Sequence, residues 1–171
     1  MPHLIRPTSI EERLEPGESA AAAAVRLARA KAAAGMHAGA LPLLAADTLV
    51  ACEGEVLGKP DSPGAAADML RALCGRTHEV VTGLCLEAGG RAFAGIETTR
   101  VRFAALSDAE IDWYVATGEP LDKAGGYHVD GRGSLFVEAI DGSPSNVAGL
   151  PVRLLLRLAH EAGVDLGWVG R

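Results

Sequence analysis

Helical and extended segments alternate along this chain, and that alternation restricts it to the α/β class of folds. An alanine-rich stretch can be capped by Ser19 and ended by Gly35, so it predicts a first helix. The apolar run Leu43–Cys52 follows, and it predicts a strand buried on both faces. The sequence therefore predicts a sheet with helices packed against it.

Seven further elements are expected downstream. They are a helix from Ser62-Pro63 to Gly75, three extended segments at 78–88, 91–97 and 98–106 with a Gly89-Gly90 turn after the first, a helix opened by the capping box Ser107–Glu110 and closed by Gly118, a strand Leu135–Ile140, and a last helix from Pro151 to Ala162. Two or three of the extended segments should pair as an antiparallel meander. No internal repeat is evident.

Length and composition fit one globular domain rather than a disordered or fibrous chain. The 171 residues are 49% hydrophobic and 22% charged, with a net charge of −6. No run of lysine or arginine occurs, so the chain has no electrostatic footprint for nucleic acid. The beginning of the chain lacks a signal-peptide core, and no apolar stretch is long enough to span a bilayer. We expect no membrane partner.

The cysteines favour a reduced, cytoplasmic location. Cys52, Cys74 and Cys85 are odd in number and lack CxxC spacing, which argues against a disulfide framework or a structural zinc site. We interpret all three as small buried hydrophobic residues.

Asp47 is the first residue that demands a chemical explanation, because it interrupts an apolar strand. A buried carboxylate is costly unless a cation, backbone donors or a metal compensates it. An aspartate at the end of a strand commonly orients water or holds Mg²⁺. The alternative is an aspartate that caps a turn.

Other candidates are weaker when taken singly. Lys59 lies between glycine and proline and can project at a phosphate, or it is an exposed turn lysine. Lys31 can be a simple solvated lysine on its helix. The glycine-rich stretch Asp122–Gly133 suits a ligand loop or tight turns between strands, and His128 within it is better explained as an ordinary histidine than as a metal ligand. The segment Ser145–Val152 can receive an anion at a helix start or simply cap that helix.

Several nucleotide and hydrolase signatures are absent from the sequence. It contains no GxxxxGK[ST] motif, no GxGxxG motif after a strand and no GxSxG nucleophile elbow. Walker-type, dinucleotide-binding and serine-hydrolase sites are therefore excluded.

An ordered set of nine motifs resembles the Maf family over nearly the whole chain. The motifs are PTSIEE, RLARAKA, AADT, GKP, a TGL strand, GEP, DKAGGY, GRGSLFVEAIDG and SNVAGLPV. The resemblance implies an elongated mixed sheet flanked by helices around a central cleft, similar to the inosine triphosphatase fold. It implies a nucleoside triphosphate pyrophosphatase, needing a divalent cation (Mg²⁺ or Mn²⁺), that often forms a homodimer.

The resemblance also assigns roles to individual residues. Asp47 matches the family's general base, and Glu12 matches the acidic residue that helps hold metal or water. Lys31 and Lys59 match the lysines that meet the triphosphate. Thr48 matches the threonine of dTTP/UTP-type members. Because in-line displacement depends on positioning and charge neutralisation, a carboxylate, a metal and two lysines form a suitable set.

The sequence departs from the family pattern in two places. The small-residue loop A-S-x-S-P-R-R, with its strand and helix, is not found in the sequence. Residues 1–171 are therefore expected to form one domain without that opening segment. We expect the natural product to begin further upstream. Asp130 stands where dTTP/UTP-type members carry glutamine, and a carboxylate only accepts hydrogen bonds, so we expect it to influence base preference. The alternative hypothesis is a related nucleotide-binding protein with weakened catalysis.

Overall fold

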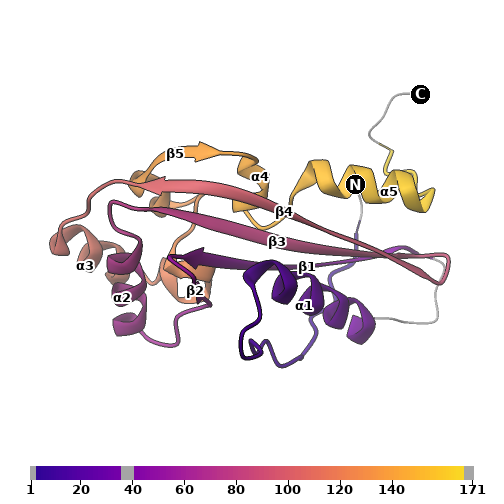
Figure 1. Cartoon of the computed structure of the whole chain (residues 1–171), viewed down its shortest axis with the longest axis horizontal. Coiled ribbons are helices and arrows are strands. Elements are labelled where there is room, and N and C mark those ends of the chain that lie inside the picture. The colour runs from indigo at the N-terminus through magenta and orange to yellow at the C-terminus, as the bar shows by residue number, and fades with distance from the viewer. Residues whose placement is uncertain (1–2, 36–40, 168–171) are drawn as a thin grey trace.

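The computed structural model describes residues 3–35 and 41–167, and they form one five-stranded sheet with helices around it (Figure 1). The strand order is β2-β1-β3-β4-β5, and every pairing is antiparallel. The strands are β1 (Leu43–Cys52), β2 (Glu55–Leu57), β3 (Thr77–Ala88), β4 (Arg91–Phe103) and β5 (Val137–Asp141). The predicted α/β class and elongated sheet are confirmed. The described sheet is antiparallel rather than mixed: two-residue turns join β1 to β2 and β3 to β4, and the longer connections also return β3 antiparallel to β1 and β5 antiparallel to β4.

The helices begin where the sequence places capping residues. They are α1 (Ala20–Gly35), α2 (Pro63–Leu73), α3 (Asp108–Ala116), α4 (Pro144–Val147) and α5 (Val152–Ala162), with short 3₁₀ turns η1 (Glu119–Asp122), η2 (Ala124–Gly126) and η3 (Arg132–Phe136). Ser62 accepts a hydrogen bond from the Ala65 N–H at 3.2 Å, and Ser107 and Glu110 form the predicted capping box. In the described residues, no helix is long and apolar enough to cross a membrane.

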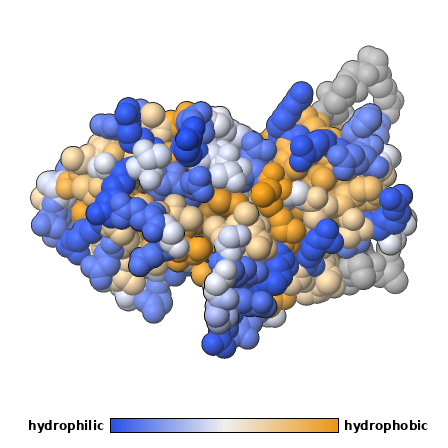
Figure 2. Space-filling model, viewed as in Figure 1, coloured by the Kyte–Doolittle hydropathy of each residue, from blue (hydrophilic) through white to orange (hydrophobic). Residues whose placement is uncertain are grey.

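The alternation of side chains along β3 assigns each helix to a face of the sheet. Val81 and Cys85 pack against the alanines of α1, whereas Leu84 and Leu86 pack against α5. Helices α1 and α5 therefore lie on opposite faces (Figure 1). Figure 2 shows hydrophobic residues across the middle of the molecular surface, between more hydrophilic ends.

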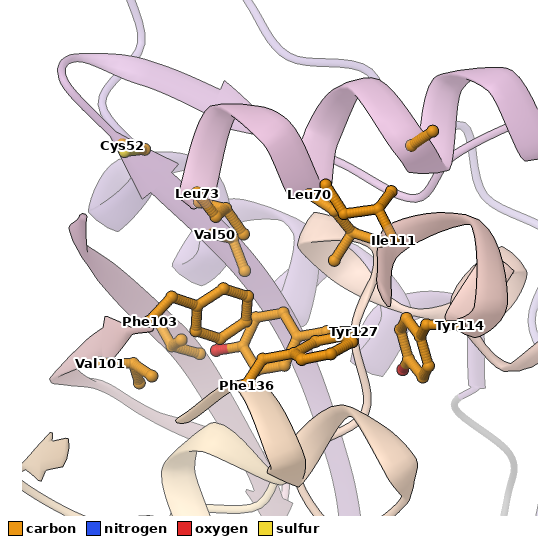
Figure 3. Close-up of a cluster of buried hydrophobic side chains, with 12 residues drawn as sticks. Val50, Cys52, Leu70, Leu73, Val101, Phe103, Ile111, Tyr114, Tyr127 and Phe136 are labelled. Atoms are coloured by element: carbon orange, nitrogen blue, oxygen red, sulfur yellow. The ribbon is translucent and has the colours of Figure 1, made fainter. Parts of the chain in front are cut away.

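A second core lies at the other end of the sheet, on the face that carries Val80. Aromatic rings dominate it, and Figure 3 shows Phe103, Tyr127, Phe136 and Tyr114 in contact below α2 and α3. Neighbouring rings meet edge to face, with centroids 4.7 Å apart for Phe103 and Tyr127. This core fixes the glycine-rich segment that follows α3 against the sheet.

Two predicted boundaries in the extended regions were wrong. The segments expected on either side of Glu97 form one continuous strand, β4, because both pair in register with β3. The strand predicted from Leu135 starts only at Val137, since residues up to Phe136 form the 3₁₀ turn η3. That turn directs the Phe136 ring onto Tyr114, at a centroid distance of 5.0 Å.

Candidate active site

Asp47 is buried in the middle of β1 with only 5% of its surface exposed. Its Oδ1 accepts a hydrogen bond from Lys31 Nζ at 2.5 Å, and its Oδ2 is buried without a hydrogen-bond partner among the residues that the structure describes. Lys31 lies on α1, which covers this face of the sheet. The compensating cation expected for a buried aspartate is therefore present, while one carboxylate oxygen remains available to water or a metal.

Glu12 and Lys59 complete a row of four charged groups. Lys31 Nζ also lies 2.7 Å from Glu12 Oε1, and Glu12 Oε2 lies 3.8 Å from Lys59 Nζ. The four side chains come from the segment before α1, from α1, from β1 and from the loop after β2. The two carboxylates and two ammonium groups thus alternate along a row, each within 4 Å of its neighbour.

Burial and pairing determine the protonation of these groups. Burial raises the pKa of Asp47, and the hydrogen bond from Lys31 opposes that rise. Burial disfavours the charged form of Lys31, but its bonds to Asp47 and Glu12 outweigh burial and raise its pKa. Lys31 holds the pKa of Glu12 below its usual value. Lys31 therefore remains a cation whose charge is shared by two carboxylates.

The four groups line a cavity of about 620 Å³ that runs along the outer edge of β1. Strand β2 pairs only with Val50, Ala51 and Cys52. In residues 3–35 and 41–167, no strand pairs with this edge between Leu43 and Leu49. The cavity therefore reaches side chains from both faces of β1, with Asp47 on the α1 face and Thr48 on the other.

Thr48, which matches the threonine of dTTP/UTP-type members and is predicted to bind substrate, also lines the cavity. Its hydroxyl lies 2.9 Å from the hydroxyl of Thr82, its partner on β3. Gly149 lines the cavity beside it, where an added Cβ would stand 3.5 Å from Thr48 Oγ1. The Gly149 backbone therefore lies close to the Thr48 hydroxyl in the cavity wall.

The glycine-rich loop forms the opposite wall and also packs against the sheet. Lys123, Tyr127 and His128 line the cavity. Gly125 donates its N–H to the Gly58 carbonyl at 3.0 Å, and a Cβ on Gly125 would stand 2.9 Å from the Val50 side chain. The loop is therefore tightly packed against the sheet, and it also faces the cavity; its role as a ligand loop stays a prediction.

Asp130 is not brought to the cavity, contrary to its predicted place in base selection. It occupies an exposed turn, whereas the preceding residues as far as Val129 line the wall. The chain turns outward here because Glu119 holds the next segment: its carboxylate accepts the N–H groups of Arg132 and Gly133 at 3.2 and 3.1 Å.

The segment Ser145–Val152 makes the predicted cap, and its residues Val147, Ala148 and Gly149 also line the cavity, so its anion-binding role stays a prediction. Ser145 Oγ accepts a hydrogen bond from the Val152 N–H, at the start of α5, at 3.2 Å.

All three cysteines are free thiols; Cys52 and Cys85 are buried, and Cys74 is partly buried.

The donor set fits a divalent cation bound together with phosphate. Across the described ranges, no cluster of three or more His, Cys, Asp or Glu side chains could form a complete protein cage. Mg²⁺ is usually held by one or two carboxylates, with phosphate oxygens and water completing its octahedron. Glu12 and Asp47, with the unpartnered Oδ2 of Asp47, meet that requirement.

Comparison with known proteins assigns the family. The family model described as "Maf-like protein" matches residues 1–162. The chain belongs to the Maf-like family. This confirms the resemblance seen in the ordered motifs.

Three curated relatives of this Maf-like chain share the name "dTTP/UTP pyrophosphatase". The protein of Anaeromyxobacter sp. (strain Fw109-5) is 50% identical over 97% of this chain and 82% of its own length. That of Moorella thermoacetica is 48% identical over 97% and 87%, and that of Pyrococcus furiosus 40% identical over 91% and 82%.

Sequence reasoning missed three features of this Maf-like site. Lys123 and Tyr127 were noted only as members of a glycine-rich stretch, yet they line the cavity. Thr82 was seen as part of a strand, yet it contacts Thr48. The charged and aromatic residues among the glycines were a usable signal for the first two, whereas the register between β1 and β3 alone reveals the third.

Proposed function

We propose that this chain is a nucleoside triphosphate pyrophosphatase that converts dTTP and UTP to the monophosphate and pyrophosphate. The observation that carries the proposal is the buried Asp47, bonded through Oδ1 to Lys31 and open at Oδ2, in the wall of a nucleotide-sized cavity. The name dTTP/UTP pyrophosphatase, carried by relatives up to 50% identical, supports the reaction and the two pyrimidine substrates.

Asp47 acts as the general base. A water molecule at Oδ2 loses its proton to the carboxylate as its oxygen forms a bond to the α-phosphorus. The bond between the α-phosphorus and the bridging oxygen then breaks, and pyrophosphate leaves with the bond's electron pair. The raised pKa of Asp47 favours this role, since a base accepts a proton more readily as its pKa approaches the working pH.

Lys31 and Lys59 neutralise the triphosphate. Lys31 is fixed by two carboxylates, so it positions Asp47 as well as contributing charge. Lys59 is about half exposed and bonded only loosely to Glu12, so it is free to follow the β- and γ-phosphates. Glu12 and Asp47 would hold the divalent cation, which when bound screens charge on the phosphate oxygens. Preorganised charge of this kind is commonly the largest contribution to such catalysis.

A triphosphate panel tests the proposal directly. The protein is incubated with dTTP, UTP, CTP, dATP and GTP in Mg²⁺ or Mn²⁺, and pyrophosphate and orthophosphate are measured separately. We expect pyrophosphate and monophosphate in equal amounts, with dTTP and UTP turned over fastest. Nucleotide binding without pyrophosphate release would instead identify a binding protein, and stepwise orthophosphate release would exclude attack at the α-phosphorus.

A further inference from the structure

A chain of hydrogen bonds leads from the Thr48 hydroxyl, at the cavity, into the buried core. Thr48 Oγ1 lies 2.9 Å from Thr82 Oγ1, and Thr82 Oγ1 lies 3.3 Å from the main-chain carbonyl oxygen of Asn146. Thr82 has no exposed surface, whereas Thr48 is partly exposed and lines the cavity. The chain therefore connects the buried core to the ligand space.

The carbonyl at the far end of this chain is held rigidly. The Asn146 side chain is fully buried, and its Nδ2 donates to the Val80 carbonyl and to Thr99 Oγ1, each at 3.0 Å. The Asn146 carbonyl also accepts the Gly149 N–H at 2.9 Å. The position of this acceptor relative to β3 is thus fixed by the fold.

The direction of each hydrogen bond follows from the number of protons. A hydroxyl has one proton to donate, and a carbonyl oxygen can only accept. The Thr82 proton is therefore given to Asn146, and Thr82 can only accept from Thr48. The single proton of Thr48 is then committed to Thr82, so Thr48 Oγ1 presents only lone pairs to the cavity.

We propose that Thr82 and the Asn146 carbonyl set the Thr48 hydroxyl as an acceptor toward the cavity, so that the site selects pyrimidines carrying an N3–H over cytosine. The inference rests on the proposed function and deepens it. Uracil and thymine carry a donor at N3, whereas N3 of cytosine is an acceptor and would face the Thr48 lone pairs. Thr82 is a positioning residue, because it acts on the base only through Thr48.

Four variants of the full chain test this proposal: Thr82→Val, Thr82→Ser, Thr48→Val and the double Thr48→Val/Thr82→Val variant. The measured quantity is the ratio of kcat/KM for UTP to that for CTP. Valine at position 82 frees the Thr48 proton, which can then be donated to cytosine N3. We expect the ratio to fall about tenfold, the equivalent of one mispaired hydrogen bond. Most of the change should be a gain with CTP, and Thr82→Ser should restore the ratio.

The double variant separates positioning from a general structural role. If Thr82 acts through Thr48, adding Thr82→Val to Thr48→Val should leave the ratio unchanged, because the two residues form one unit. Thr98→Val, an exposed substitution on β4, is the matched control and should leave the ratio at the parent value. Thermal melting checks the fold, which should persist because the Asn146 carbonyl keeps its bond to Gly149.

Failure of this proposal differs from failure of the proposed function. A parent enzyme that favours UTP, with an unchanged ratio in Thr82→Val or additive losses in the double variant, would overturn the positioning role alone. A parent without pyrophosphate release would overturn the proposed function. Calorimetric binding of UMP and CMP to the parent and to Thr82→Val would then decide the inference, which requires tighter UMP binding in the parent and a reduced preference in the variant.

Discussion

Gly83 of β3 lies directly against the backbone of Ala24 in α1: a Cβ added to Gly83 would stand 2.3 Å from the Ala24 carbonyl oxygen. Gly83 is also the cross-strand partner of Asp47. The helix that carries Lys31 therefore packs backbone against backbone on the sheet at the residue paired with Asp47. Small residues on α1, among them the fully buried Ala28 and Ala32, allow this approach along the helix.

Gly83→Ala should consequently push α1 away from the sheet. We expect a loss of about 1–3 kcal/mol in the free energy of unfolding, as for overpacked cores. Activity should fall as well, because Lys31 retreats from Asp47. Gly64→Ala is the control, since Gly64 is exposed in α2 with nothing near its added Cβ, and it should stabilise slightly. Urea unfolding measures the free energy of unfolding of both variants, and pyrophosphate release measures their activity. Equal stability of the two variants would contradict the close packing.

Asp47→Asn should abolish most turnover while leaving the fold intact. The amide cannot accept a proton from water, and loss of a general base typically costs ~10²–10⁴-fold in rate. Lys31 keeps its bond to Glu12, so the melting temperature should change little. The pyrophosphate release of Asp47→Asn is compared with that of the control Asp112→Asn, an exposed substitution on α3. Parental activity in a folded Asp47→Asn protein would remove Asp47 from the mechanism.

Chelation of divalent cations should stop pyrophosphate release, and Mg²⁺ or Mn²⁺ should restore it. Glu12→Gln should raise the metal concentration that gives half-maximal activity by about tenfold or more, because one of two carboxylate donors is lost. Glu11→Gln is a matched control, because Glu11 is the exposed neighbour of Glu12 and lies outside the cavity lining. An unchanged metal requirement in Glu12→Gln would place the cation elsewhere.

Acid should destabilise the fold through His78, which is 1% exposed. Burial lowers its pKa from 6.5 to about 4, and its ring bonds the Tyr127 hydroxyl at 2.9 Å. The unfolded chain therefore takes up a proton as pH falls below 6.5, while the folded chain does so only near 4. The stability that His78 contributes above pH 6.5 is therefore lost as the pH falls from 6.5 toward 4.

The size of this effect can be isolated with His78→Phe. The free energy of unfolding should drop by about 2 kcal/mol more in the parent than in the variant between pH 7.5 and pH 5. His160→Gln, an exposed change on α5, should behave like the parent. A parental pH dependence in His78→Phe would show that other groups cause it.

Asp130→Gln should leave the relative kcat/KM values for dTTP, UTP and CTP unchanged. The reason is that Asp130 lies on an exposed turn outside the cavity lining. Measurement of the three substrates with parent and variant checks this expectation. A shift toward dTTP and UTP would show that the turn folds inward when nucleotide binds.

Local signals predicted most of the fold. Ser62 and Ser107 cap helices as expected, and β1 has the predicted bounds, because capping and apolar runs act between near neighbours in sequence. The start of β5 was missed because Phe136 is held by Tyr114, a contact that local propensity does not report. The antiparallel direction of the described sheet likewise depends on which strands become neighbours.

The charged part of the site was predictable for a different reason. A buried carboxylate needs a cation, so Asp47 demanded a partner, and the family motifs supplied Lys31 and Glu12. Asp130 lies on an exposed turn outside the cavity lining, a placement that its position in a motif could not give, because a motif does not fix the direction of a side chain. Thr82 was missed because a threonine in a strand has no distinctive sequence signal, and its contact with Thr48 depends on strand register.

The β3–β4 hairpin described above also offers a place for a reporter. Its tip is Gly89-Gly90; among the described residues nothing lies within 4 Å of a Cβ added to either glycine, and Thr82 lies seven residues before Gly89 along β3. At about 3.3 Å per residue, the tip stands roughly 23 Å from Thr82, which contacts the cavity-lining Thr48. A peptide tag or fluorescent label inserted there would be attached to a strand that passes the cavity at Val80, so it should report nucleotide binding without blocking entry.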